Sequence, residues 1–158
     1  VWVRVDPRGT AAQPENDNTP DGTFAWVTGQ GSPGGSLGEN DVDGGTTSLV
    51  SNRIDLSGTQ SATIAYARWY SNSAGASPNA DVFEVFGSDD DGQTYVPVET
   101  VGPAGPGTSG GWIVTGFDVA DFVDLTTTVR VKFVASDLGS GSIVEAGIDD
   151  VRVLHHKF

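Results

Sequence analysis

Two aspartates and two glycines in the first third of the chain are spaced as metal ligands could be. Asp41 and Asp43 are two residues apart, so in an extended segment their side chains share one face. Gly44 and Gly45 follow and can turn backbone carbonyls toward the same point. Carboxylates and carbonyls at short range are the ligands that calcium takes. The segment therefore predicts half of a calcium site. The alternative is a turn in which the aspartates accept hydrogen bonds from backbone amides.

The other half of this site is expected near the end of the chain, at Asp149 and Asp150. Residues 142–154 form the last predicted strand, and its apolar side chains change face across this pair, from Ile148 to Val151. Such a switch predicts a β-bulge, which re-aims the neighbouring side chains. We expect Asp149 or Asp150 to join the earlier aspartates at one calcium ion.

A second group of residues could contact a sugar ring. Trp69 lies between Arg68 and Tyr70 at the end of the predicted strand 61–71, and Asn72 follows. An aromatic face beside hydrogen-bonding groups suits the apolar face and the hydroxyls of a pyranose. These four residues are therefore the predicted ligand-binding residues. The alternative for Trp69 is a packing role in the core.

Acidic side chains on or beside the predicted strands raise the alternative of a glycan-active enzyme. Glycosidases hold two carboxyl groups on either side of the scissile bond. The candidates are Glu84, Glu99, Asp137 and Glu145. The sequence places no two of them at one cleft, and it contains no nucleophile-elbow motif. We therefore expect the chain not to be an enzyme.

The charge of the chain limits its partners. Twenty-one acidic residues against eight basic ones give a formal net charge of −13. We expect neither nucleic acids nor anionic membrane surfaces as partners, because both are bound through clustered Lys and Arg. The chain has no cysteine, so disulfides are excluded. Stability must then come from core packing, with a metal ion as a possible addition.

Short alternating segments separated by glycine- and proline-rich turns predict an all-β fold. The clearest is 129–135, where apolar residues alternate with Arg130 and Lys132. Pro97 inside the predicted strand 94–101 favours a sheet edge. We expect residues 1–158 to form a single antiparallel two-sheet β-sandwich, a jelly roll, with a β-barrel as the alternative.

The order of several motifs resembles the MAM-like jelly-roll domains appended to secreted bacterial proteins, including extracellular metallopeptidases. The motifs are Asp41-Val42-Asp43-Gly44-Gly45, Arg68-Trp69-Tyr70, the turn Ser88-Asp89-Asp90-Asp91-Gly92 and Ile148-Asp149-Asp150-Val151. The resemblance covers 24–154, whereas residues 1–23, a short strand and a long loop, match less well. It implies an extracellular β-sandwich without catalysis, often with a structural calcium near the Asp-x-Asp loop and the last strand.

Three functional hypotheses follow. The first is a noncatalytic, calcium-stabilised binding or adhesion module of a secreted protein, whose ligand is a polysaccharide, a glycan or a protein. The second is a small jelly-roll enzyme that acts on glycans. The third is a structural module that packs on a parent catalytic domain or self-assembles through its edge strands.

Overall fold

The computed structural model describes residues 1–139 and 141–155, and it confirms the predicted antiparallel two-sheet sandwich. The described chain forms nine strands and one 3-10 turn: β1 (Val3–Val5), β2 (Ala25–Val27), β3 (Gly45–Val50), β4 (Ala62–Gly75), β5 (Phe83–Ser88), β6 (Val96–Val101), β7 (Ile113–Asp118), η1 (Val119–Asp121), β8 (Arg130–Asp137) and β9 (Ser142–His155).

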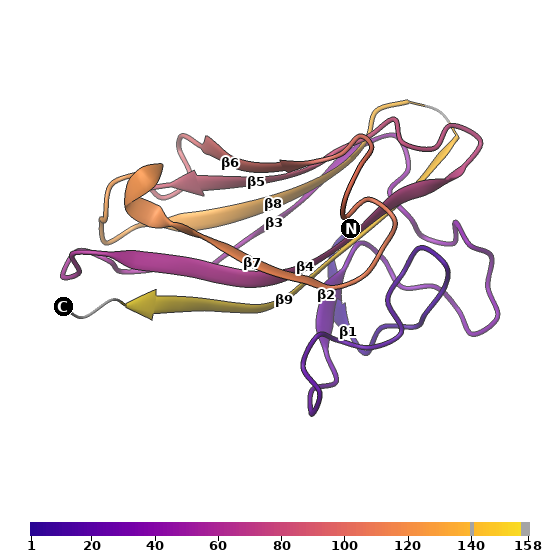
Figure 1. The fold of residues 1–158 in the computed structure, drawn as a ribbon, viewed down its shortest axis with the longest axis horizontal. Coiled ribbons are helices and arrows are strands. Elements are labelled where there is room, and N and C mark those ends of the chain that lie inside the picture. The colour runs from indigo at the N-terminus through magenta and orange to yellow at the C-terminus, as the bar shows by residue number, and fades with distance from the viewer. Residues whose placement is uncertain (140, 156–158) are drawn as a thin grey trace.

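The strands form two layers that lie face to face (Figure 1). One sheet has five strands in the order β1-β2-β9-β4-β7, and the other has four in the order β3-β8-β5-β6. All of the described pairings are antiparallel. β6 lies at an edge, as predicted from Pro97, because proline has no N–H to donate to a neighbouring strand in a ladder.

One cluster of buried side chains fills the space between the sheets. Tyr66 and Phe133 meet edge to face with ring centroids 5.1 Å apart, and Tyr70 lies against Phe83 at 5.7 Å. These aromatic pairs join β4 of one sheet to β5 and β8 of the other. Burial of such large apolar side chains is the main favourable term in folding, so these contacts hold the two layers in register.

A long loop, residues 6–24, packs on the outer face of the five-stranded sheet. The indole N–H of Trp69 donates to the carbonyl of Ala12 at 2.7 Å, and that of Trp112 donates to the carbonyl of Asn16 at 2.9 Å. The two rings meet edge to face at 6.0 Å. Since each tryptophan fixes one loop carbonyl, the loop has a defined path despite its polar composition.

Two details differ from the sequence-based expectation. The sequence also predicts a short strand over residues 54–56, but the structure has only an isolated bridge between Ile54 and Val129 there. β4 is longer than expected, at 14 residues, because it pairs with the equally long β9 along most of its length. Within the described residues, no helix is long and apolar enough to cross a membrane.

Candidate functional site

Trp26 is exposed at the edge of the sandwich even though it belongs to a sheet. Its neighbours in β2, Ala25 and Val27, are buried, whereas the Trp26 side chain is 37% exposed. It stands in register with Arg4 of β1 and Ile148 of β9. The four-stranded sheet ends at β3, so the ring is only partly covered from the opposite layer.

Two adjoining hollows meet at Trp26. One, of about 370 Å³, lies between β2 and β9 on one side and the end of β3 on the other. The second, of about 340 Å³, opens toward β1 and the bulge of β9. They share Trp26, Ile148 and Val151, so we describe them together as the Trp26 groove. The remaining lining residues are Leu49, Val50, Ser51, Asn52, Phe133, Arg4, Phe24, Asp149 and Asp150.

The two ends of the Trp26 groove differ in character. Toward β1, the Arg4 guanidinium carbon stands 5.1 Å from the centroid of the Phe24 ring, a side chain that is 48% exposed. Asp149 and Asp150 lie at the same end. At the other end Ser51 and Asn52 contribute polar groups beyond the apolar side chain of Val50. Exposed aromatic surface is thus flanked by hydrogen-bonding groups at both ends.

The carboxylates of this groove are oriented by the long N-terminal loop. The backbone N–H of Asn18 donates to Asp149 Oδ2 at 2.9 Å, and the Asn18 side-chain amide donates to Asp150 Oδ2 at 2.9 Å. The Thr19 hydroxyl donates to Asp150 Oδ1 at 2.9 Å. Each carboxylate oxygen can accept more than one hydrogen bond. Both aspartates can therefore accept hydrogen bonds from ligand hydroxyls while the loop holds them in place.

The predicted β-bulge is confirmed and explains how these aspartates come to line the groove. The β4–β9 register shifts between Ala65 and Ala67, where β9 carries one extra residue. Asp150 has φ 50°, in the left-handed region that only glycine, asparagine and aspartate adopt at low cost. The bulge turns Asp150 toward Asn18 and Thr19, and leaves Val151 exposed at the groove.

In the structure, the two halves of the predicted calcium site, Asp41 with Asp43 and Asp149 with Asp150, make different contacts. Asp41 lies near Asp43 and Asp137, and its pKa is raised to about 6 by partial burial and by these two carboxylates. Asp149 and Asp150 are instead engaged by the N-terminal loop. Among the described residues, no three His, Cys, Asp or Glu side chains form a group that could hold a metal ion. Calcium binding at Asp41 and Asp43 stays a prediction.

The predicted sugar-binding residues do not form one surface, because alternate residues of β4 point to opposite sides of the sheet. Tyr70 and Asn72 are fully buried and face the interior. Arg68 is 8% exposed and is paired with Glu99 at 3.0 Å. Trp69 lies on the outer face, half-buried beneath the loop. Of the four, only Trp69 has a side chain that a ligand could reach in part.

The four acidic candidates for catalysis are also separate. Glu99 accepts hydrogen bonds from Tyr66 and Arg68, which bind it from the other sheet. Glu145 is buried and accepts a hydrogen bond from Thr28 at 3.0 Å. Glu84 follows Phe83 in β5, and Asp137 ends β8 inside the sandwich. No two of them line any one of the pockets described here.

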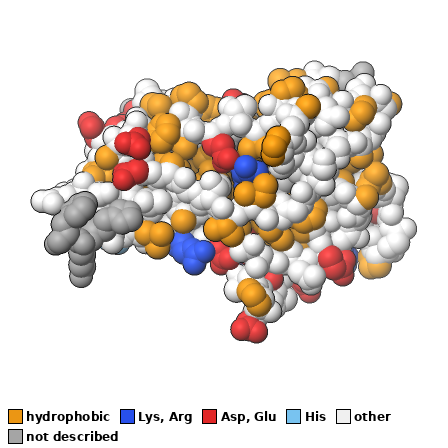
Figure 2. All heavy atoms as spheres, viewed as in Figure 1, with side chains coloured by type: hydrophobic (Ala, Val, Ile, Leu, Met, Phe, Trp, Pro, Cys, Tyr) orange, Lys and Arg blue, Asp and Glu red, His pale blue; other side chains and the backbone are white. Residues whose placement is uncertain are grey.

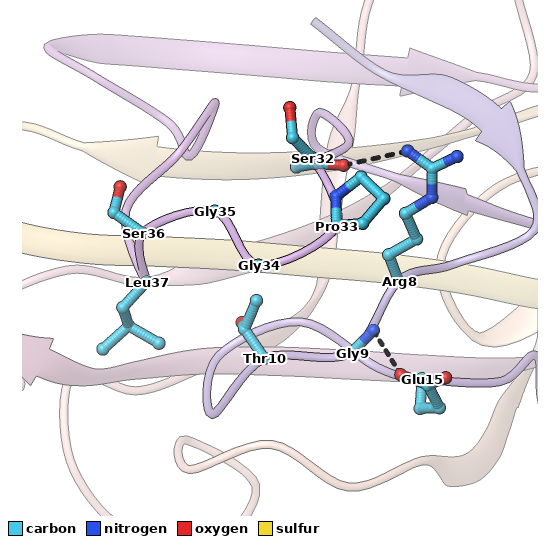
Figure 3. Close-up of a pocket in the computed structure, with 11 residues that line it drawn as sticks. Arg8, Gly9, Thr10, Glu15, Ser32, Pro33, Gly34, Gly35, Ser36 and Leu37 are labelled. Atoms are coloured by element: carbon cyan, nitrogen blue, oxygen red, sulfur yellow. Dashed lines mark hydrogen bonds between the residues drawn. The ribbon is translucent and has the colours of Figure 1, made fainter.

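A larger hollow, of about 570 Å³, lies between two loops, 8–15 and 31–37 (Figure 3). Its charged groups are already engaged: the Gly9 N–H donates to Glu15 at 2.7 Å, and Arg8 donates to the carbonyl of Gly31 at 3.4 Å. The rest of its lining is mostly glycine, serine and proline, with no aromatic ring. It therefore lacks the flat apolar surface that the Trp26 groove offers.

Sequence reasoning missed Trp26 as a candidate. The segment Phe24-Ala25-Trp26-Val27 alternates small and aromatic residues, which predicts a strand over residues 24–28 but not which face is open. The exposure of Trp26 depends on β3 ending opposite β9, a property of the assembled sandwich. The one available signal was the presence of two aromatic residues on the same face of a very short strand.

Comparisons with known proteins establish the fold. No model of a protein family matches the sequence, and no curated protein matches it. A solved structure described as a non-crystalline cellulose specific carbohydrate-binding module, CBM28, aligns with a TM-score of 0.52 and 12% identity, over 98% of this chain and 88% of that one. A second, described as CBM4, aligns at 0.45 and 15% identity, over 98% and 94%. These comparisons do not support the resemblance to MAM-like domains.

Proposed function

We propose that this chain is a noncatalytic module that binds a polysaccharide chain in the Trp26 groove. The observation that carries the proposal is the exposed ring of Trp26, continued by Phe24 and flanked by polar groups at both ends. A pyranose has apolar C–H faces that pack on an aromatic ring and hydroxyls that need acceptors and donors at its rim. Asp149 and Asp150 supply acceptors, and Arg4 supplies donors.

The arrangement of the acids favours binding over hydrolysis. Glycoside hydrolysis uses two carboxyl groups about 5–9.5 Å apart on either side of the scissile bond. The two carboxylates of the groove are adjacent in sequence, and both accept hydrogen bonds from the same short loop segment, Asn18 and Thr19. They are therefore placed to fix the orientation of a ligand from one side.

A neutral β-glucan chain in non-crystalline form is the first ligand to test. The structure that aligns with a TM-score of 0.52 is described as specific for non-crystalline cellulose. The Trp26 groove consists of two adjoining hollows, and a concave surface suits a single chain better than the flat face of a crystal. We further propose an extracellular setting, with a parent catalytic domain as the partner that such a module would bring to its substrate.

The test is binding to non-crystalline cellulose and soluble cello-oligosaccharides, measured by pull-down and calorimetry. Trp26→Ala should weaken binding by about thirtyfold or more, because loss of a central aromatic anchor costs roughly 2 kcal/mol. Phe24→Ala should weaken it less, since Phe24 lies at one end. An unchanged unfolding midpoint would show that each variant keeps its fold.

The matched control is Trp69→Ala, which removes the tryptophan that lies under the loop on the outer face of the same sheet. This variant should keep most of the glucan binding, because Trp69 reaches the groove only through the loop that holds Asp149 and Asp150. Loss of binding in Trp69→Ala with retention in Trp26→Ala would move the site to the outer face and overturn the proposal. Hydrolysis of the oligosaccharides by the wild-type chain would also contradict the proposal and would support a glycan-active enzyme instead.

A further inference from the structure

The interior of the sandwich ends in a cluster of polar side chains with unpartnered oxygens. Asn72 continues the inward side of β4 beyond Tyr70 and is fully buried. Asp81 precedes β5 and Asp137 ends β8, and they are 3% and 4% exposed. Asn72 Oδ1, Asp81 Oδ2 and Asp137 Oδ1 are all buried, and none has a hydrogen-bond partner among the described residues. Such groups are rare in folded proteins, because an unpaired buried oxygen costs free energy.

Contacts place Asn72 beside Asp81, and Asp81 beside the backbone that follows Asp137. The Asn72 side-chain amide donates to the backbone carbonyl of Asp81 at 2.6 Å and to the Tyr70 hydroxyl at 3.1 Å. The N–H of Leu138, next to Asp137, donates to Asp81 Oδ1 at 2.8 Å. Burial raises the pKa of the Tyr70 hydroxyl, and the charges of Asp81 and Asp137 raise it further. The charges of both carboxylates thus act on one hydroxyl, which itself contacts Asn72.

The cluster holds acceptors and lacks a positive charge. The Asn72 nitrogen also lies 3.1 Å from the carbonyl of Pro103. Because this carbonyl and that of Asp81 can only accept, the two amide hydrogens face them and Oδ1 is the unpaired acceptor. Among the described residues, the single hydrogen-bond donor to Asp137 Oδ2 is the N–H of Gly44, at 3.3 Å. Among the described residues, no Lys, Arg or His forms an ion pair with Asp81 or Asp137. Two buried carboxylates without a nearby positive charge are energetically unfavourable. A bound cation would offset this cost.

We propose that Asn72, Asp81 and Asp137 bind one calcium ion inside this end of the sandwich. The ligands are two carboxylate oxygens and an amide oxygen, and backbone carbonyls complete the shell. Calcium accepts six to eight oxygens in irregular geometry, whereas magnesium keeps several waters, which a buried site does not admit readily. The absence of cysteine excludes a thiolate zinc site. The ion joins the end of β4 in one sheet to β5 and β8 in the other.

The experiment compares thermal unfolding of the chelator-treated chain with and without calcium, alongside the calcium content after equilibration. Wild type should take up calcium, and its midpoint should rise by about 5–10 °C at a free concentration near a hundred times the dissociation constant. Asp81→Asn and Asp137→Asn should lose that rise. In chelator both variants should be at least as stable as wild type, because each removes a buried charge that has no partner.

Asp41→Asn and Asp149→Asn test the other calcium site, the one predicted from the sequence, and both should keep the calcium-dependent rise if the ion binds in the interior. A rise that survives in Asp81→Asn and Asp137→Asn, or one lost in Asp41→Asn, would overturn the proposal. If the interior variants do not fold, a crystal structure of wild type grown in calcium decides the question. Density about 2.3–2.6 Å from Asn72 Oδ1 and the two carboxylates supports the site. Water or empty space there, or calcium elsewhere, refutes it.

Discussion

Glu145 is a buried acid on the outer face of β9, and its protonation links stability to pH. Burial raises its pKa to about 8, and the charge of Asp41 adds to this, against a hydrogen bond from Thr28 that lowers it. An unfolded glutamate loses its proton near pH 4.5. Between about pH 4.5 and 8 the folded chain therefore holds a proton that the unfolded chain releases, so stability falls as pH rises through this window.

We expect the free energy of unfolding to decline by up to about 1.4 kcal/mol per pH unit from this group, levelling off above pH 8. Glu145→Gln stays neutral at every pH and should flatten the decline. Glu84→Gln is the matched control, since Glu84 is a half-buried glutamate of β5. Denaturant unfolding at a series of pH values measures both. An equal slope in wild type and Glu145→Gln would show that Glu145 is ionised in the folded chain.

Single residues show where reading the sequence was least reliable. The alternation of β4 correctly identified a strand, but it could not tell that Tyr70 and Asn72 face the interior and Trp69 the outside. Both faces of that strand are covered, one by the second sheet and one by the loop. Periodicity then reports which residues share a face, but not which face a ligand can reach.

At the scale of elements, the bulge in β9 was predictable from the sequence, but the position of the N-terminal loop that contacts it was not. The change of face between Ile148 and Val151 identified it from the sequence alone. The loop that meets Asp149 and Asp150 has no periodicity and few apolar residues, so nothing in its sequence fixed its path. Its position depends on single hydrogen bonds from Trp69, Trp112 and Asn18.

Asn18→Ala should loosen this loop without unfolding the sandwich. The change removes one charge-assisted hydrogen bond, to Asp150, and should lower the free energy of unfolding by about 1–2 kcal/mol at most. Amide exchange in residues 12–19 should become faster, while exchange in β4 and β8 stays slow. Mass spectrometry of exchanged peptides measures this.

Asn16→Ala is the matched control in the same loop. Asn16 contributes its backbone carbonyl to Trp112, and alanine keeps that carbonyl. Its exchange pattern should equal that of wild type. Equal exchange in Asn18→Ala and wild type would mean that the Asn18–Asp150 contact does not hold the loop, and that Trp69 and Trp112 suffice.

At the scale of the whole molecule, alternating strands and turn spacing were enough to predict the sandwich. Alternation fixes which side chains of each strand are buried, and two sheets that bury one face each are the simplest solution. The Trp26 groove could not be predicted in this way. It exists because the five-stranded sheet extends beyond the edge of the four-stranded one, next to β1 and β2. The relative extent of two sheets is a property of the full set of pairings.

The net charge of −13 makes a final prediction about which polysaccharides bind. Figure 2 shows acidic side chains spread over the drawn face with few basic ones between them, and the groove itself carries Asp149 and Asp150 against a single basic side chain, Arg4. An anionic polymer should therefore be repelled, while a neutral one is not. Hydroxyethyl cellulose and carboxymethyl cellulose share one backbone and test this directly by affinity electrophoresis.

Retention by the neutral polymer should change little with salt, because hydrogen bonds and ring packing carry it. Retention by carboxymethyl cellulose should be weaker at low salt. It should recover as the ionic strength approaches about 0.1 M, where charges are screened beyond roughly 10 Å. Asp149→Asn should reduce the difference in retention between the neutral and the anionic polymer, since it removes one repelling charge at the groove. Stronger retention by the anionic polymer at low salt would place binding on a basic surface and exclude the Trp26 groove as its site.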